Sequence, residues 1–221
     1  MLPALIASLM LLLQSIQQTP GQIRDRFVQC VAECGVLVPF KPEVSEQTEQ
    51  PTIYYSDTQR TVFYPVWSGV DPTGRLLTGK NGSEAPARAW FDDAFLSLLI
   101  PHELGHWLET IDDRHIDHWS SELQANQIAL AFWRLEMDDD AALYRRLSAY
   151  WGPLAEIPSP VPQGDETADY FNSAPFDPST YGWYQGQMMQ LSWAQRDAMD
   201  FCGLVDQAWQ RRPQTDQAGV E

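Results

Sequence analysis

The stretch PHELGHWLETIDDRHIDHWSSELQAN, residues 101–126, holds the pattern that decides both the fold and the chemistry expected of this chain. His102 and His106 are four residues apart, so on a helix they share one face, with Cβ atoms about 5–6 Å apart. Two imidazoles so placed can bind one Zn²⁺ through nitrogens at about 2.0–2.1 Å. Glu103 is rotated by about 100° from His102, so its carboxylate can reach a water on the metal without binding the metal itself. The pattern therefore predicts a zinc-binding helix with Glu103 as general base.

A zinc site needs a third protein ligand, and the residues after the histidines offer four candidates. Asp112 follows the second histidine by six residues, and His115 and His118 lie in the connection between two predicted helices. Glu122 lies on the next predicted helix, and a helix–loop–helix hairpin brings that position back over the first helix. The sequence favours Glu122 and leaves the other three as alternatives.

An H-E-x-x-H pattern followed on the next helix by E-x-x-A-N resembles the gluzincins, the thermolysin-like grouping of zinc metallopeptidases, and especially their short-spacer bacterial members. The resemblance covers residues 102–126 specifically and the β-rich run at 61–67 only loosely. It implies three zinc ligands, His102, His106 and Glu122, with the catalytic glutamate between the first two. The implied activity is that of an endopeptidase in which metal-activated water hydrolyses a peptide bond.

The same resemblance implies two supporting groups. Asn126, one turn after Glu122, matches an Asp or Asn that orients a ligand histidine, whose second ring N–H needs an acceptor. A plain helix-surface amide is the alternative for Asn126. The family also supplies a His or Tyr that hydrogen-bonds the oxyanion, and no histidine follows His118. The tyrosines of YFNSAPFDPSTYGWYQ are the remaining candidates, each also compatible with a core position, in the order Tyr184, Tyr181, Tyr170.

Periodic segments on both sides of this stretch predict the fold. Two β-rich runs joined by SDTQR predict a hairpin, and Pro65 in the second run predicts an edge strand. Together the elements predict an α+β, zincin-like fold: a small β-sheet with an edge strand next to the active-site helix, then a mostly helical C-terminal half. The predicted helices are 21–34, 92–111, 118–136, 139–151 and 179–210, the last broken near Gly203; the predicted strands are 52–55 and 61–67, after a linker at 41–51.

Pro101 departs from a regular helix because it directly precedes His102. Inside a helix it removes the backbone hydrogen bond to Ser97. Either the helix begins near Ile100 or a kink is tolerated.

The ends of the chain set the predicted domain boundaries. Leu2 to Leu13 form an apolar run, too short for a membrane span of about 20 residues but typical of the core of a secretory signal. No Lys or Arg precedes the run and no small-x-small site follows it, so a first buried helix is the alternative. The expected division is 1–20, signal peptide or first apolar helix; 21–210, a single metallopeptidase-like domain; 211–221, a disordered tail. A signal implies export to the periplasm or the extracellular space, with a cytoplasmic location as the alternative.

Three cysteines exclude a four-thiolate zinc site. Cys30 and Cys34 lie one helical turn apart on an apolar stripe, which favours buried thiols. A disulfide from either of them to Cys202 is the alternative, and it would fit an oxidising compartment.

The charge limits the partners. Thirty acidic against fourteen basic residues leave a formal net charge of −16, which argues against nucleic-acid binding as the main function. Residues 101–140 carry ten acidic and two basic side chains, which biases the site toward cationic or neutral peptides, unless this is only a solvated acidic surface. The expected partner is a peptide or protein substrate, with no stable transmembrane anchor and no indication of oligomeric state. The alternative function is a zincin-fold regulatory or sensor protein that acts on one partner with little general proteolysis.

Overall fold

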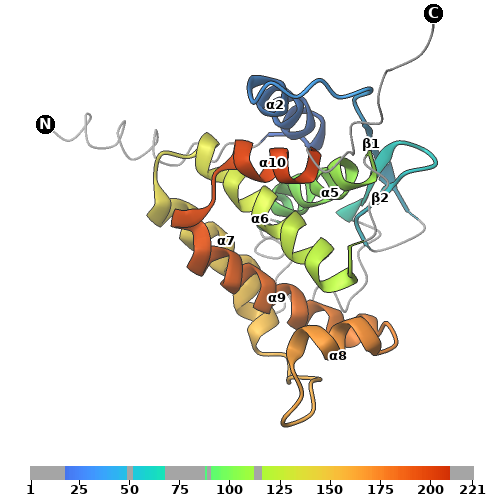
Figure 1. The fold of residues 1–221 in the computed structure, drawn as a ribbon, viewed down its shortest axis with the longest axis vertical. Helices are drawn as coiled ribbons and strands as arrows, with labels where there is room; N and C mark the ends of the chain where they lie inside the picture. The colour runs from blue at the N-terminus through green and yellow to red at the C-terminus, as the bar shows by residue number, and fades with distance from the viewer. Residues whose placement is uncertain (1–17, 49–51, 68–87, 89–90, 112–115, 210–221) are drawn as a thin grey trace, which may run out of the picture.

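The computed structural model describes residues 18–48, 52–67, 88, 91–111 and 116–209, which form an α+β fold with a small sheet and a mostly helical remainder (Figure 1). The elements are α2 (Pro20–Glu33), β1 (Glu43–Gln47), β2 (Tyr54–Ser56), β3 (Thr61–Pro65), the π-helix η2 (Phe91–Leu96), α5 (Ser97–Thr110), α6 (His118–Glu136), α7 (Asp140–Ala155), α8 (Thr167–Ser173), α9 (Pro178–Gln195), the 3₁₀ helix η3 (Arg196–Ala198) and α10 (Phe201–Trp209). The predicted segments 1–20 and 211–221 lie outside the described residues, except for 18–20.

The sheet has the strand order β1-β3-β2, with β1 parallel and β2 antiparallel to β3. The predicted hairpin is confirmed as β2 and β3. The prediction of an edge strand at 61–67 is wrong, because β3 is central. The polar sequence EVSEQ, which we had assigned to a linker, forms β1 and covers the other side of β3. Pro65 is tolerated there because it is the last residue of β3. The edge strand beside α5 is therefore β2.

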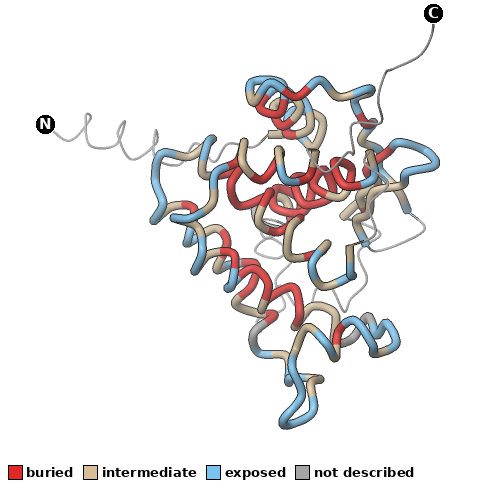
Figure 2. The backbone as a smooth tube through the Cα atoms, in the orientation of Figure 1, coloured by how far each residue is buried: buried red, intermediate tan, exposed pale blue. Residues whose placement is uncertain are grey.

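Helices α5 and α6 pack against one another in the core, where Figure 2 shows the buried residues concentrated. Residues 97–105 of α5 are all buried, as expected of a helix that is apolar almost all round. Gly105 allows the close approach of α6, because a Cβ at its position would lie 3.0 Å from the Cα of Ala125. This contact sets Glu122, three residues before Ala125, opposite the two histidines of α5.

Pro101 lies inside α5 rather than before it. Of the two alternatives, the helix continues through the proline. The Ser97 carbonyl, which loses its helical partner, accepts a hydrogen bond from the indole Nε1–H of Trp133 at 3.0 Å. Trp133 belongs to α6, so the carbonyl that Pro101 leaves without a helical partner forms a hydrogen bond between α5 and α6.

Helix α2 begins with a capping box at Thr19 and ends at Glu33, and Gly35, just past its end, has the positive φ of 85° that favours glycine there. Cys34 forms a disulfide with Cys202 of α10, across a sequence separation of 168 residues. Cys30 is a buried free thiol. Cys30 is therefore a buried thiol, as the sequence favoured for both cysteines. Cys34 instead forms the disulfide with Cys202 that was the alternative.

The helical C-terminal half follows the predicted order with two differences. Helix α8 was not predicted, and the interruption of 179–210 falls at η3 instead of Gly203. Gly203 lies inside α10, where its N–H donates to the side chain of Asp200 at 2.8 Å, so Asp200 starts a new helix. Among the described helices, none combines the length and apolarity needed to cross a membrane.

Candidate metal centre

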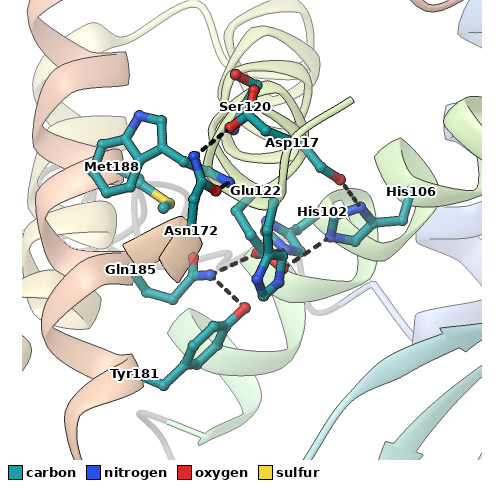
Figure 3. Close-up of polar contacts among 12 residues, drawn as sticks. His102, His106, Asp117, Ser120, Glu122, Asn172, Tyr181, Gln185 and Met188 are labelled. Atoms are coloured by element: carbon teal, nitrogen blue, oxygen red, sulfur yellow. Dashed lines mark hydrogen bonds and ion pairs between the residues drawn. The ribbon is translucent and has the colours of Figure 1, made fainter. Parts of the chain in front are cut away.

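Three side chains that could hold a metal ion, His102, His106 and Glu122, converge between α5 and α6 (Figure 3). The Nε2 of His102 lies 3.2 Å from Oε2 of Glu122, and the Nε2 of His106 lies 3.7 Å from Oε1 of the same carboxylate. One ligand atom from each of the three residues lies within 4.8 Å of the other two. The structure thus brings together the set His102, His106 and Glu122 at a spacing that one divalent cation can bridge.

Glu103 lies beside this cluster and is 7% exposed. The backbone N–H of Tyr55, on the edge strand β2, donates to its Oε2 at 2.9 Å. Burial raises the pKa of Glu103, and this effect outweighs the opposite influence of His102 and His106. A carboxylate with a raised pKa is suited to take up and return a proton near neutral pH.

A cavity of about 280 Å³ opens onto the cluster. It is lined by Ile53, by Tyr54 and Tyr55 of β2, and by Tyr181 of α9. The cavity also includes Asp57 and Thr110 beside the metal-binding side chains and Glu103. A ligand in this space would meet both the cluster and the edge of the sheet.

The second ring nitrogen of His106 is held by a carboxylate. Its Nδ1 lies 3.1 Å from Oε2 of Glu109, and the hydroxyl of Ser121 donates to that same oxygen at 2.6 Å. Burial lowers the pKa of His106, but hydrogen bonds with Glu109 and Glu122 outweigh it and keep this pKa well above its usual value. A carboxylate on Nδ1 orients the ring and makes Nε2 a stronger ligand. The sequence analysis did not include Glu109. Its position three residues after His106 could have indicated it, because residues three apart lie on the same face of a helix.

Asn126 is fully buried, which excludes the surface-amide alternative. Its Nδ2 donates to the backbone carbonyl of Glu122 and to Oε1 of Gln185, both at 2.9 Å. Its Oδ1 and the Nδ1 of His102 are buried and have no hydrogen-bond partner among the described residues. An imidazole that binds metal through Nε2 carries its proton on Nδ1, so the two atoms are a complementary donor and acceptor, but the structure shows no hydrogen bond between them and the orienting role of Asn126 stays a prediction.

Gln185 of α9 contacts both Asn126 and Glu122, and Figure 3 shows its contact with Glu122. Its Nε2 donates to Oε2 of Glu122 at 2.7 Å and to the hydroxyl oxygen of Tyr181 at 2.8 Å. Its side-chain amide is thus fully engaged within the site. No local pattern in the sequence indicated the contact of Gln185 with Glu122.

Of the three candidate tyrosines, only one lines the cavity at the cluster. Tyr181 lines the cavity of the metal cluster, whereas Tyr184, the first choice from the sequence, does not. Tyr184 packs on Phe171, with ring centroids 4.7 Å apart, and Tyr170 belongs to the same aromatic group. Burial and the charge of Glu122 raise the pKa of Tyr181 well above its usual value, which keeps its hydroxyl protonated.

The remaining candidate ligands are less well placed. The Nε2 of His118 lies 3.5 Å from Oε1 of Glu122, but this side chain is 54% exposed and is not part of the three-residue cluster. Asp112 and His115 lie outside the described residues. Burial raises the pKa of Glu122, but its three histidine neighbours outweigh this and hold it well below the usual value. Glu122 is therefore an anion among imidazoles, which suits a metal ligand.

No protein-family model, curated protein or solved structure matches this chain. The case for its function therefore rests on the geometry of the site.

Proposed function

We propose that the protein is a zinc-dependent endopeptidase that resembles the gluzincins. The observation that carries this proposal is the cluster of His102, His106 and Glu122 with Glu103 beside it, in a cavity bordered by a strand edge. Two imidazoles and a carboxylate form the donor set of catalytic zinc sites that keep one position open. The zincin-like interpretation of the α+β fold belongs to the same proposal.

The residues of the site have distinct roles in the proposed reaction. When bound, zinc supplies Lewis-acid polarisation and lowers the pKa of a water toward 7. Glu103, oriented by the N–H of Tyr55, accepts a proton from the attacking water and passes it to the leaving amine. Tyr181, not Tyr184, is the hydroxyl that lies in the cavity, and we assign to it the hydrogen bond to the oxyanion.

The edge of β2 supports the binding of an extended substrate. This strand pairs with β3 on one side, and the Tyr55 N–H points toward α5 on the other. An extended peptide backbone can lie along such an edge and pass in front of the cluster. Strand β3 cannot take this role, because β1 and β2 cover it on both sides.

The proposal predicts one zinc per chain and chelator-sensitive proteolysis. Native mass spectrometry should find one zinc in the wild-type protein, and cleavage of casein should stop with chelator and return with Zn²⁺. His102→Ala and Glu122→Ala should lose the metal and the activity, because two ligands hold zinc poorly. Glu166→Gln, at an exposed carboxylate away from the site, is the control. Undiminished zinc in Glu122→Ala would refute the ligand assignment.

Gln185→Leu should weaken zinc binding about 10–100-fold, because the residue loses its hydrogen bond to the Glu122 carboxylate. The affinity is measured by competition with a chelator of known zinc affinity. Gln190→Leu, at an exposed position on α9, is the matched control. Equal zinc affinities in the two variants would show that Gln185 does not position the ligand.

The disulfide supports a further part of the proposal, that the protein acts outside the cytoplasm. A bond between Cys34 and Cys202 persists in an oxidising compartment such as the periplasm or the extracellular space.

A further inference from the structure

A second cavity, of about 330 Å³, lies next to the metal cavity between α6, α8 and α9. We call it the aromatic pocket because five aromatic rings line it. They belong to Tyr170, Phe171, Phe176, Tyr181 and Tyr184. The ring centroid of Phe171 lies 4.7 Å from that of Tyr184 and 6.2 Å from that of Tyr181.

Two residues connect the aromatic pocket to the metal cluster. Tyr181 lines both cavities, and its hydroxyl points toward Gln185 and the metal-binding side chains (Figure 3). His118 lines the aromatic pocket, stacks on Phe171 with centroids 4.7 Å apart, and lies 3.5 Å from the carboxylate of Glu122. A substrate bound at the cluster can therefore place one of its side chains in the aromatic pocket.

The rim of the pocket joins an exposed ring to a carboxylate. Phe176 is 67% exposed, and its ring centroid lies 5.3 Å from that of Tyr181. Asp177 follows it and also lines the pocket. Phe176 therefore offers a solvent-accessible ring to a ligand in the pocket.

Apart from the imidazole of His118, the charged side chains around the pocket are acidic. The sequence from 147 to 195, which includes all of α8 and α9, contains five Asp and Glu residues and no Lys or Arg. Among the described residues that line the pocket, none is Lys or Arg. Aromatic faces attract cations, and a neighbouring carboxylate adds to this attraction while it disfavours anionic groups.

We propose that the aromatic pocket binds the side chain of an arginine or lysine in the peptide substrate, next to the bond that is cleaved. The methylene stem lies against Phe171 and Phe176, and the cationic head lies between the tyrosine rings and Asp177. This inference rests on the proposed peptidase function and adds a substrate class to it. Arginine suits the pocket best, because its planar guanidinium both stacks on rings and pairs with a carboxylate.

The test is a series of peptides that differ at one position, scanned over three residues on each side of the cleaved bond. Arginine is compared with citrulline, which has nearly the same shape without the charge, and with leucine and glutamate. At one position, kcat/KM should be about fivefold higher for arginine than for citrulline and lowest for glutamate. Asp177→Asn should lower kcat/KM for the arginine peptide to the value for the citrulline peptide, while the control Asp165→Asn, outside the pocket, should keep the preference for arginine.

A binding measurement separates failure of this inference from failure of the peptidase proposal. In ¹H–¹⁵N spectra of the wild-type protein, acetyl-arginine methylamide should shift resonances of residues 174–184, and the citrulline analogue should not. Chelator-sensitive cleavage with equal rates for arginine and citrulline at every position overturns the pocket assignment and leaves the peptidase proposal standing. Absence of cleavage together with arginine-specific shifts supports the pocket and overturns the peptidase proposal. Absence of both overturns both.

Discussion

Glu103→Gln should lower kcat/KM for peptide hydrolysis by about 10³–10⁴-fold while one zinc per chain is retained. The amide has the shape of the carboxylate and can still accept the hydrogen bond that the Tyr55 N–H donates to Glu103. It cannot accept a proton from water, so the expected defect lies in the chemical step. Glu103 is not one of the three clustered ligands, and the metal should therefore stay bound.

The measurement combines steady-state kinetics on one peptide with metal analysis and thermal unfolding of the same preparation. Glu166→Gln repeats the substitution at an exposed position and should match the wild type. Full activity in Glu103→Gln would contradict the general-base mechanism. Loss of zinc in this variant would instead assign Glu103 to the metal, against the geometry.

Cys34→Ser or Cys202→Ser should lower the free energy of unfolding by about 4–5 kcal/mol, the second large effect expected for this protein. The disulfide joins the end of α2 to α10 across 168 residues. Closing so long a loop removes much of the conformational entropy of the unfolded chain in the chain-entropy model. Both helices pack on the core around α5, so loss of the link should be felt throughout the fold.

Urea unfolding of the oxidised protein, the reduced protein and both serine variants measures this effect. Cys30→Ala is the control because Cys30 is buried and free, and its change should be closer to 1 kcal/mol. Burial raises the pKa of the Cys30 thiol to about 11, so exchange with the neighbouring disulfide should be slow at neutral pH. Equal stability of the oxidised and reduced proteins would show that the long loop contributes nothing.

Local patterns in the sequence were enough to predict most helices. The boundaries of α6 match the prediction at 118–136, and α2 ends one residue before the predicted 34. These ends depend on capping residues within a few positions, such as Asp117, whose side chain accepts from the Ser120 N–H at 3.0 Å. Strand β1 was missed because its stability comes from pairing with β3, 18 residues away in register, rather than from its own polar residues.

Some residues of the functional site could likewise be predicted from local sequence, whereas others could not. The spacing of His102 and His106 along one helix fixes their common face, so this pair follows from the sequence alone. Tyr181 and Tyr184 are three residues apart on α9, so their side chains differ in direction by only about 60°, and which of them reaches the cavity depends on the rotation of α9 relative to α6. No local signal sets that rotation. Gln185, Glu109 and Ser121 reach the ligands through contacts that exist only after the helices have packed.

The sequence by itself determined the helical pattern, the paired histidines and the glutamate between them, because these depend on residues within about one turn of each other. Tertiary structure decided how close α6 comes to α5, through the contact of Gly105 with Ala125, and so where Glu122 lies. It also decided that β3 is central, that Cys34 rather than Cys30 pairs with Cys202, and that Tyr181 faces the metal cavity. Each of these depends on packing between segments distant in the chain. Such packing cannot be predicted from residue type and local spacing alone.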